Sequence, residues 1–94
     1  MPEYKRVILK LSGEALAGDG KGYNDDIIEN IAHQVKELLS RGMEIGVVIG
    51  GGNYWRGRSN DSIDRTKADQ IGMLATVMNC IYVSEIFRSK GIMT

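Results

Sequence analysis

Three consecutive glycines, Gly50 to Gly52, are the part of this sequence best suited to binding an anion. Glycine has no Cβ, so a ligand can approach the backbone closely and several N–H groups can turn toward it. The triplet follows an apolar run, where a phosphate-binding turn and a tight turn without a ligand are both open. Two familiar phosphate loops are excluded, because the sequence has no G-x-x-x-x-G-K-[ST] and its G-x-G-x-G, at 18–22, has the wrong spacing for G-x-G-x-x-G. We expect the triplet to bind phosphate.

Two cations stand near these glycines in the expected structure. Lys10 lies near the end of an apolar run and is followed by Ser12 and Gly13, so its ammonium either reaches a bound phosphate or extends into water. Arg56 follows the triplet, and its planar guanidinium suits two-point phosphate contact, although a solvated arginine is the simpler alternative. Cations and glycine turns that meet at one place suit phosphoryl transfer, which needs charge stabilisation and alignment.

Asp69 is the candidate carboxylate. It stands near the expected start of a long helix, on the side of the loop that follows the triplet. Its oxygens can accept hydrogen bonds from ligand hydroxyls, or they can favour the positive end of the helix. The sequence leaves both roles open.

The elements that must position these residues are two strands and two helices. Short apolar runs with β-branched members predict strands over 4–11 and 45–49, the second buried on both faces. Apolar residues at helical spacing predict helices over 24–41 and about 64–90. Asn24 is the candidate N-cap of the first helix, Asp25 and Asp26 lie in its first turn, and Gly42 follows its end.

This order of elements predicts an α/β fold with a parallel βαβ sheet and covering helices. The carboxyl ends of parallel strands meet at one rim of the sheet, which is where ligands bind in such folds. Gly13 and the glycine triplet each follow a strand. We therefore expect them to lie on the same rim.

Composition restricts the remaining possibilities. In 94 residues, 12 basic side chains balance 12 acidic ones, so no basic surface for nucleic acid is expected. A chain of this length can form one hydrophobic core, so at most one domain is expected. The single Cys80 excludes an internal disulfide, and neither a zinc pattern nor a signal peptide is evident, so a cytoplasmic location is expected.

The stretch from Gln70 to Ser84 contains no charged residue. It is shorter than the about 20 apolar residues of a membrane span, and no membrane association is expected. Two strands offer too little protein to bury this helix all round. Part of its surface is therefore expected to meet another subunit or further sequence.

Three segments, in order, resemble the bacterial UMP kinases (uridylate kinases) of the amino acid kinase family. They are KRVILKLSGEAL at 5–16, GVVIGGGNYWRG at 46–57 and ADQIGMLATVMN at 68–79. The resemblance runs over essentially the whole chain but covers only the N-terminal portion of that family, well under half of a full-length member. Residues 1–94 would then be the N-terminal part of one amino acid kinase domain.

The resemblance implies an enzyme that transfers the γ-phosphoryl of ATP to UMP, giving UDP for pyrimidine nucleotide biosynthesis, with Mg²⁺ accompanying ATP. No general base is needed, because the acceptor is already a phosphate oxyanion. The family's later strands, its uracil-binding and adenine-binding parts and its remaining catalytic carboxylate have no counterpart here, so the 94 residues alone are expected to be inactive. It also implies a homo-oligomer, a hexamer built from dimers. GTP is an effector of many members through the loop matching about 18–23, which is one residue shorter here than in some relatives.

Residue roles follow from the same resemblance. Lys10 matches the lysine that stabilises the transferring phosphoryl, so Lys10 and Arg56 are the expected catalytic residues. Gly51 and Asp69 are expected on the UMP side. The expected ATP-binding residues are Lys10, Leu11, Ser12, Gly13, Gly52 and Arg56.

Two other functions stay open. A kinase of the same fold could phosphorylate a carboxylate or carbamate, as glutamate, acetylglutamate and carbamate kinases do, although the string Gly-Gly-Gly-Asn-x-x-Arg-Gly and Asp69 favour UMP. The chain could instead be a non-catalytic oligomerisation module held together by its uncharged helix.

Overall fold

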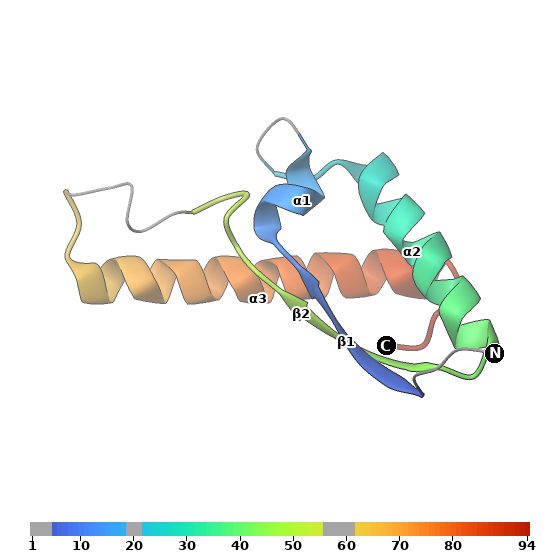
Figure 1. The fold of residues 1–94 in the computed structure, drawn as a ribbon. Coiled ribbons are helices and arrows are strands. Elements are labelled where there is room, and N and C mark those ends of the chain that lie inside the picture. Colours follow the sequence, from blue (N-terminus) through green and yellow to red (C-terminus); the bar gives the residue numbers. More distant parts are fainter. Residues whose placement is uncertain (1–4, 19–21, 56–61) are drawn as a thin grey trace.

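A computed structural model describes residues 5–18, 22–55 and 62–94. The elements are strand β1 (Arg6–Leu11), helix α1 (Gly13–Ala17), helix α2 (Asp25–Ser40), strand β2 (Glu44–Ile49) and helix α3 (Arg65–Ser89). The two strands cross the long α3, and α2 lies beside its C-terminal half (Figure 1). The predicted α/β architecture is confirmed.

The two strands are parallel and in register over their full length. Arg6 pairs with Glu44 at one end, and Leu11 pairs with Ile49 at the other. One further bond, from the Gly50 N–H to the Leu11 carbonyl at 2.9 Å, extends the ladder past β2. Because both strands end at the same level, the residues that follow them start from one rim of the sheet, as the sequence predicts.

Capping side chains set the starts of both long helices. The Asn24 carboxamide accepts from the Ile27 N–H at 3.2 Å, with Asp25 and Asp26 in the first turn of α2. The Asp64 carboxylate accepts from the Thr66 N–H at 3.1 Å at the start of α3. Gly42, which follows α2, has a φ of +85° that glycine adopts without strain. The predicted ranges, 24–41 and about 64–90, therefore differ from these two helices only by including the cap residues.

The core lies on one face of the sheet only. Leu11 and Ile49 point to that face and pack with Ile28 of α2 and Phe87 of α3. Along both strands, residues that face the core alternate with exposed residues on the opposite face. The exposed ones include Ile8 at 76% and Val48 at 51% exposure. The prediction that the second strand is buried on both faces is therefore wrong. Consecutive apolar residues permit two-sided burial, but both long helices of this chain cover the same side.

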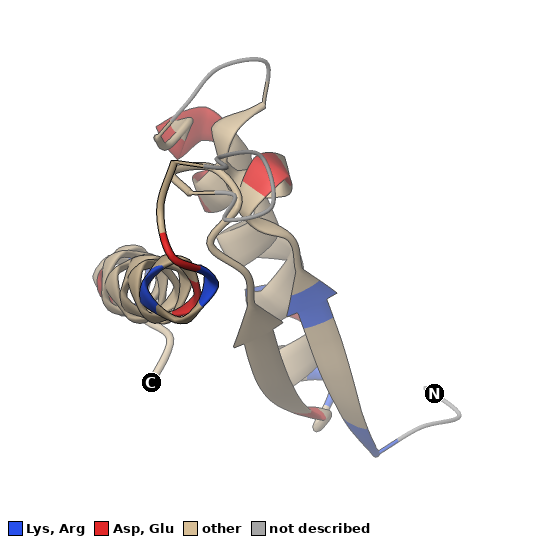
Figure 2. Ribbon diagram, turned by 90° about the vertical axis from the view of Figure 1, so that its left-hand side faces the viewer, with Lys and Arg blue, Asp and Glu red and all other residues tan. Residues whose placement is uncertain are grey.

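Helix α3 is only partly covered by the rest of the chain. Its buried positions are Ala68, Ala75, Asn79, Val83 and Phe87. Leu74 at 69% and Ile81 at 67% exposure belong to an apolar surface on its other side. By length and composition alone α3 could cross a membrane. Figure 2, which looks along α3 from its N-terminal end, shows charged residues at that end and the sheet to one side of the helix.

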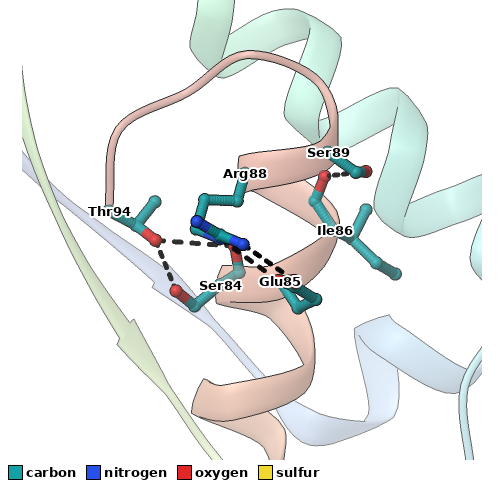
Figure 3. Close-up of polar contacts among 6 residues, drawn as sticks. All are labelled: Ser84, Glu85, Ile86, Arg88, Ser89 and Thr94. Carbon is teal, nitrogen blue, oxygen red and sulfur yellow. Dashed lines mark hydrogen bonds and ion pairs between the residues drawn. The ribbon is translucent and has the colours of Figure 1, made fainter.

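The chain turns back after α3 and joins the core. Ile92 is buried, and the hydroxyls of Ser84 and Thr94 are hydrogen-bonded to each other (Figure 3). Beside them Glu85 pairs with Arg88 at 3.2 Å, which lowers the pKa of the carboxyl and raises the pKa of the guanidinium. The last residues therefore lie against α3 and close one end of the core.

Candidate functional site

The glycine turn, defined as Gly50–Asn53, leaves β2 at the rim of the sheet. The Gly51 carbonyl accepts from the N–H groups of Tyr54 and Trp55, both at 3.1 Å, which closes the turn. Among the hydrogen bonds of the described residues, none uses the N–H of Gly51 or Gly52 as donor. Two backbone donors of this turn are thus free to bind an anion.

Gly13 brings the other strand end into direct contact with this turn. A Cβ built on Gly13 would lie 2.3 Å from the Gly52 nitrogen and 2.7 Å from the Asn53 nitrogen. A Cβ built on Gly50 would lie 3.4 Å from the Gly13 nitrogen. Only glycine at position 13 permits this approach. The expectation that Gly13 and the triplet share one rim is confirmed.

Gly51 lies against α3. A Cβ on this residue would come within 3.0 Å of both the Ala75 Cβ and the Thr76 backbone nitrogen. The missing side chain therefore serves the contact between the turn and the helix. This packing requirement accounts for glycine at position 51 without any ligand, and the UMP-side role stays a prediction.

Lys10 occupies the uncovered face of the sheet near its carboxyl end. It pairs in register with Val48, and its side chain is exposed. Within the described part of the chain the Lys10 ammonium has no hydrogen bond or ion pair. An exposed ammonium near the rim fits both alternatives that the sequence left open, a bound phosphate and water, so the ATP-binding and catalytic roles of Lys10 stay predictions.

The side chains of the next two predicted ATP-binding residues, Leu11 and Ser12, make contacts within the protein. The Leu11 side chain is buried in the core, so only its backbone faces the rim. The Ser12 hydroxyl accepts from the Ala15 N–H at 3.2 Å and caps α1. We infer that these residues shape the rim, and that a ligand would meet them mainly through backbone atoms.

Arg56 lies outside the described residues, so the predicted meeting of Lys10 and Arg56 stays a prediction. The residue before it, Trp55, contacts α3. The Trp55 indole N–H donates to the Ala68 carbonyl at 2.9 Å, and a Cβ on Gly72 would lie 3.5 Å from the indole ring. Trp55, the last described residue before position 56, therefore lies against the first turns of α3.

Asp69 stands in that same part of α3. Its carboxylate is exposed and pairs with Arg65 one turn earlier at 3.5 Å. It lies six residues before the Ala75 contact of the glycine turn, about 9 Å along the helix axis at 1.5 Å per residue. Asp64 supplies the N-cap, so Asp69 is not needed to start the helix.

Two buried amides were missed by reasoning from the sequence. Asn79 is fully buried, and its Nδ2 donates to the Gly50 carbonyl at 2.8 Å and to Asn53 Oδ1 at 2.7 Å. The Asn53 Nδ2 in turn donates to the Gly22 carbonyl at 2.8 Å. The signal in the sequence was an amide within an uncharged stretch, where a buried polar group needs partners.

Three tyrosines connect the α2 entry segment, defined as Gly22–Asn24, to the glycine turn and to α3. The rings of Tyr23 and Tyr82 are stacked with centroids 3.8 Å apart, and Tyr54 meets Tyr23 edge-on at 5.4 Å. Burial raises the pKa of Tyr23. The Tyr82 hydroxyl donates to Asp25 at 2.6 Å, and this hydrogen bond raises the pKa of Tyr82 to about 12.

Comparison with known protein families shows which family this chain belongs to. The sequence model of the amino acid kinase family matches residues 5–94, nearly the whole chain. The chain belongs to the amino acid kinase family. The strand ends, the glycine turn and α3 all fall within the matched range.

Solved structures of two UMP kinases resemble this amino acid kinase family member closely. The UMP kinase of Bacillus anthracis is 41% identical, with a TM-score of 0.84, and the match covers 93% of this chain and 37% of that one. The UMP kinase of Ureaplasma parvum is 29% identical, with a TM-score of 0.86, and the match covers 97% of this chain and 41% of that one. The chain thus spans about two-fifths of the length of these structures.

The described residues of this family member contain no group of three or more His, Cys, Asp or Glu that could hold a metal ion. An apolar cavity of about 280 Å³ lies between α2, β2, α3 and the last residues, and none of the predicted site residues lines it. The rim is the better candidate, because it combines free backbone donors with a nearby cation. The loop at about 18–23, for which the resemblance implies a link to GTP, lies partly outside the described residues, at 19–21.

Proposed function

We propose that the protein containing this chain is a UMP kinase, which transfers the γ-phosphoryl of ATP to UMP and forms UDP. The observation that carries the proposal is the contact of Gly13 with the glycine turn at the carboxyl ends of two parallel strands. Likeness to two UMP kinases over nearly the whole chain supports UMP as the acceptor. Because those structures are much longer, catalysis is assigned to the whole protein.

In this proposal the rim binds the phosphates that react. The N–H groups of Gly51 and Gly52 and the Lys10 ammonium stabilise the negative charge of the transferring group, which requires donors already in place before reaction. Arg56 adds a second cation. No residue acts as general base, because the acceptor is a phosphate oxyanion, and Mg²⁺ enters with ATP as part of the substrate.

The two nucleotides would occupy different sides of the rim. ATP phosphates would meet Lys10, Gly13 and Gly52, together with the backbone of Leu11 and Ser12. UMP would lie toward α3, between Gly51 and the Asp69 carboxylate, whose oxygens accept hydrogen bonds from sugar hydroxyls. GTP as an effector belongs to the same proposal and is tested by adding it to the assay.

The test uses the full-length product of the gene that encodes this chain. UMP, glutamate, acetylglutamate and carbamate are offered as acceptors with ATP, and product formation is measured. We expect UDP as the main product. A preference for a carboxylate or carbamate acceptor, or no phosphorylation at all, would contradict the proposal.

Lys10→Ala tests the site itself. We expect kcat to fall by about a hundredfold or more, the scale of losing one preorganised charge-stabilising group. Lys5→Ala is the matched control, because Lys5 is an exposed lysine just before the other end of β1. Equal activity of Lys10→Ala and the unmodified protein would remove Lys10 from the mechanism and would favour a non-catalytic module.

We propose further that a second copy of this chain covers the exposed apolar side of α3. The stretch 70–84 carries no charge, so two such surfaces can meet without burying an unpaired ion. Equilibrium sedimentation over a range of concentrations tests this, and a monomer at every concentration would contradict it.

A further inference from the structure

We propose that Asn79 is a positioning residue, whose buried carboxamide holds both ends of the glycine turn and ties the turn to the α2 entry segment. Its effect on catalysis rests on the proposed kinase function, whereas its effect on the turn does not. Asn79 is placed in the middle of α3 and is fully buried.

Every hydrogen-bonding group of the Asn79 side chain has a partner in a different part of the turn region. A carboxamide has two N–H donors and one acceptor oxygen. One donor reaches the Gly50 carbonyl at 2.8 Å and the other reaches Asn53 Oδ1 at 2.7 Å. Its Oδ1 accepts from the Tyr23 hydroxyl at 2.7 Å. Gly50 and Asn53 are the first and last residues of the turn, so one side chain fixes both ends.

The α3 surface meets the turn at a second point one helical turn earlier. Ala75 and Asn79 are four residues apart and therefore share a face of α3. Gly51 packs against Ala75 and Thr76, while Asn79 bonds the residues on either side. Helix α3 thus fixes the position and the orientation of the glycine turn at two points.

The same side chain reaches the α2 entry segment by two routes. One passes through the Tyr23 hydroxyl. The other passes through Asn53, which exchanges hydrogen bonds with Gly22: Asn53 Nδ2 donates to the Gly22 carbonyl at 2.8 Å, and the Gly22 N–H donates to the Asn53 carbonyl at 3.2 Å. Because a buried amide is costly unless all its partners are in place, the three segments are expected to order together.

Preorganised donors lose their value when they shift, and an error of about 1 Å can cost on the order of a hundredfold in rate. Asn79→Ala removes all three bonds and leaves the Gly50 carbonyl without this partner. Asn79→Asp keeps the shape and the acceptor for Tyr23, but it places oxygen against two oxygens. Tyr23→Phe is the matched control, because it removes one bond to Asn79 while keeping the ring and leaving the glycine turn untouched.

The experiment measures kinetics and hydrogen exchange on the full-length product of the gene. We expect Asn79→Ala and Asn79→Asp to lower kcat for UDP formation by about tenfold to a hundredfold per folded molecule. We expect Tyr23→Phe to stay within about threefold. In both Asn79 variants without nucleotide, the N–H groups of Gly22 and Tyr54, which close the turn region, should exchange faster, while those in the middle of α2 keep their protection.

Two results would overturn the proposal: unchanged kcat in both Asn79 variants, or unchanged exchange at Gly22 and Tyr54. If the unmodified protein does not phosphorylate UMP, the proposed function fails, and the exchange data alone decide the role of Asn79. If neither Asn79 variant folds, exchange in the unmodified protein decides, because rapid exchange at Gly22 and Tyr54 would mean that the turn is not held.

Discussion

Two glycines of the rim lack a side chain for different physical reasons. At Gly13 a Cβ would collide with backbone nitrogens of the glycine turn, and backbone cannot move aside as a flexible side chain can. At Gly51 the space is taken by α3. The sequence left two reasons open for the strand-end glycines, close approach of a ligand and a tight turn without one. At both positions packing within the protein already disfavours a side chain, most strongly at Gly13.

Gly13→Ala should be strongly destabilising, whereas Gly46→Ala should not. The first places a methyl group 2.3 Å from the Gly52 nitrogen, and overpacking of this kind costs about 1–3 kcal/mol. At Gly46 the nearest atom would be Ile8 Cγ1 at 3.9 Å, an ordinary contact on the uncovered face. That change should leave the free energy of unfolding within about 1 kcal/mol. Denaturant unfolding of both variants measures the difference, and equal midpoints would contradict the predicted contact.

At the same scale, Lys10 and Asn79 mark what a sequence can and cannot predict. The position of Lys10 near the end of an apolar run placed it near the rim, because the end of a strand is a local property of the sequence. Asn79 became a candidate only when α3 was placed against the glycine turn. Its partners lie 26, 29 and 56 positions away in the sequence. No local pattern specifies contacts of that range.

The elements themselves were largely predictable. Asn24 and Asp64 cap their helices, and Gly42 follows the end of α2, as local capping rules require. Two expectations differed from the structure: the short helix α1 was not predicted, and a run of apolar residues in β2 predicted burial on both faces. Which faces are covered depends on where other elements pack, and both α2 and α3 pack on the same one.

Tyr82 links α3 to the first turn of α2 and makes the stability of the folded protein depend on pH. The pKa of Tyr82 in the folded protein is about 12, against 10.0 for the free side chain, mainly because its hydroxyl donates to Asp25. A raised pKa means that the folded state holds the proton more tightly than the unfolded state. The resulting stability is fully present below pH 10 and is lost as the pH rises from 10 toward 12.

Tyr82→Phe should remove that part of the alkaline destabilisation. The phenyl ring can keep the stacking on Tyr23, so the variant isolates the hydroxyl. We expect the gap in free energy of unfolding between the two proteins to narrow from pH 9 to pH 12, measured by urea titration at each pH. A gap independent of pH would show that the bond to Asp25 does not shift the titration of Tyr82.

At the scale of the whole molecule, the chain leaves much apolar surface uncovered. The sheet has one bare face, and α3 carries large exposed side chains along its outer side, among them Met73, Leu74, Val77 and Ile81. Exposed patches of this kind mark surfaces that meet other protein. The bare face holds Lys10 and alternates charged and apolar residues, while the α3 side has no charge from 70 to 84. The α3 side is therefore the better surface for a second copy.

Leu74→Glu tests that assignment. Leu74 is 69% exposed, so a glutamate there can be solvated in the monomer, but it would bury an unpaired charge between two copies. We expect the variant to sediment as a smaller species and its melting temperature to lose the dependence on protein concentration that an associating protein has. Gln34→Glu adds the same charge on the exposed side of α2 and should change neither property. If Leu74→Glu associates as strongly as the unmodified protein, α3 is not the interface and the bare face of the sheet becomes the surface to test.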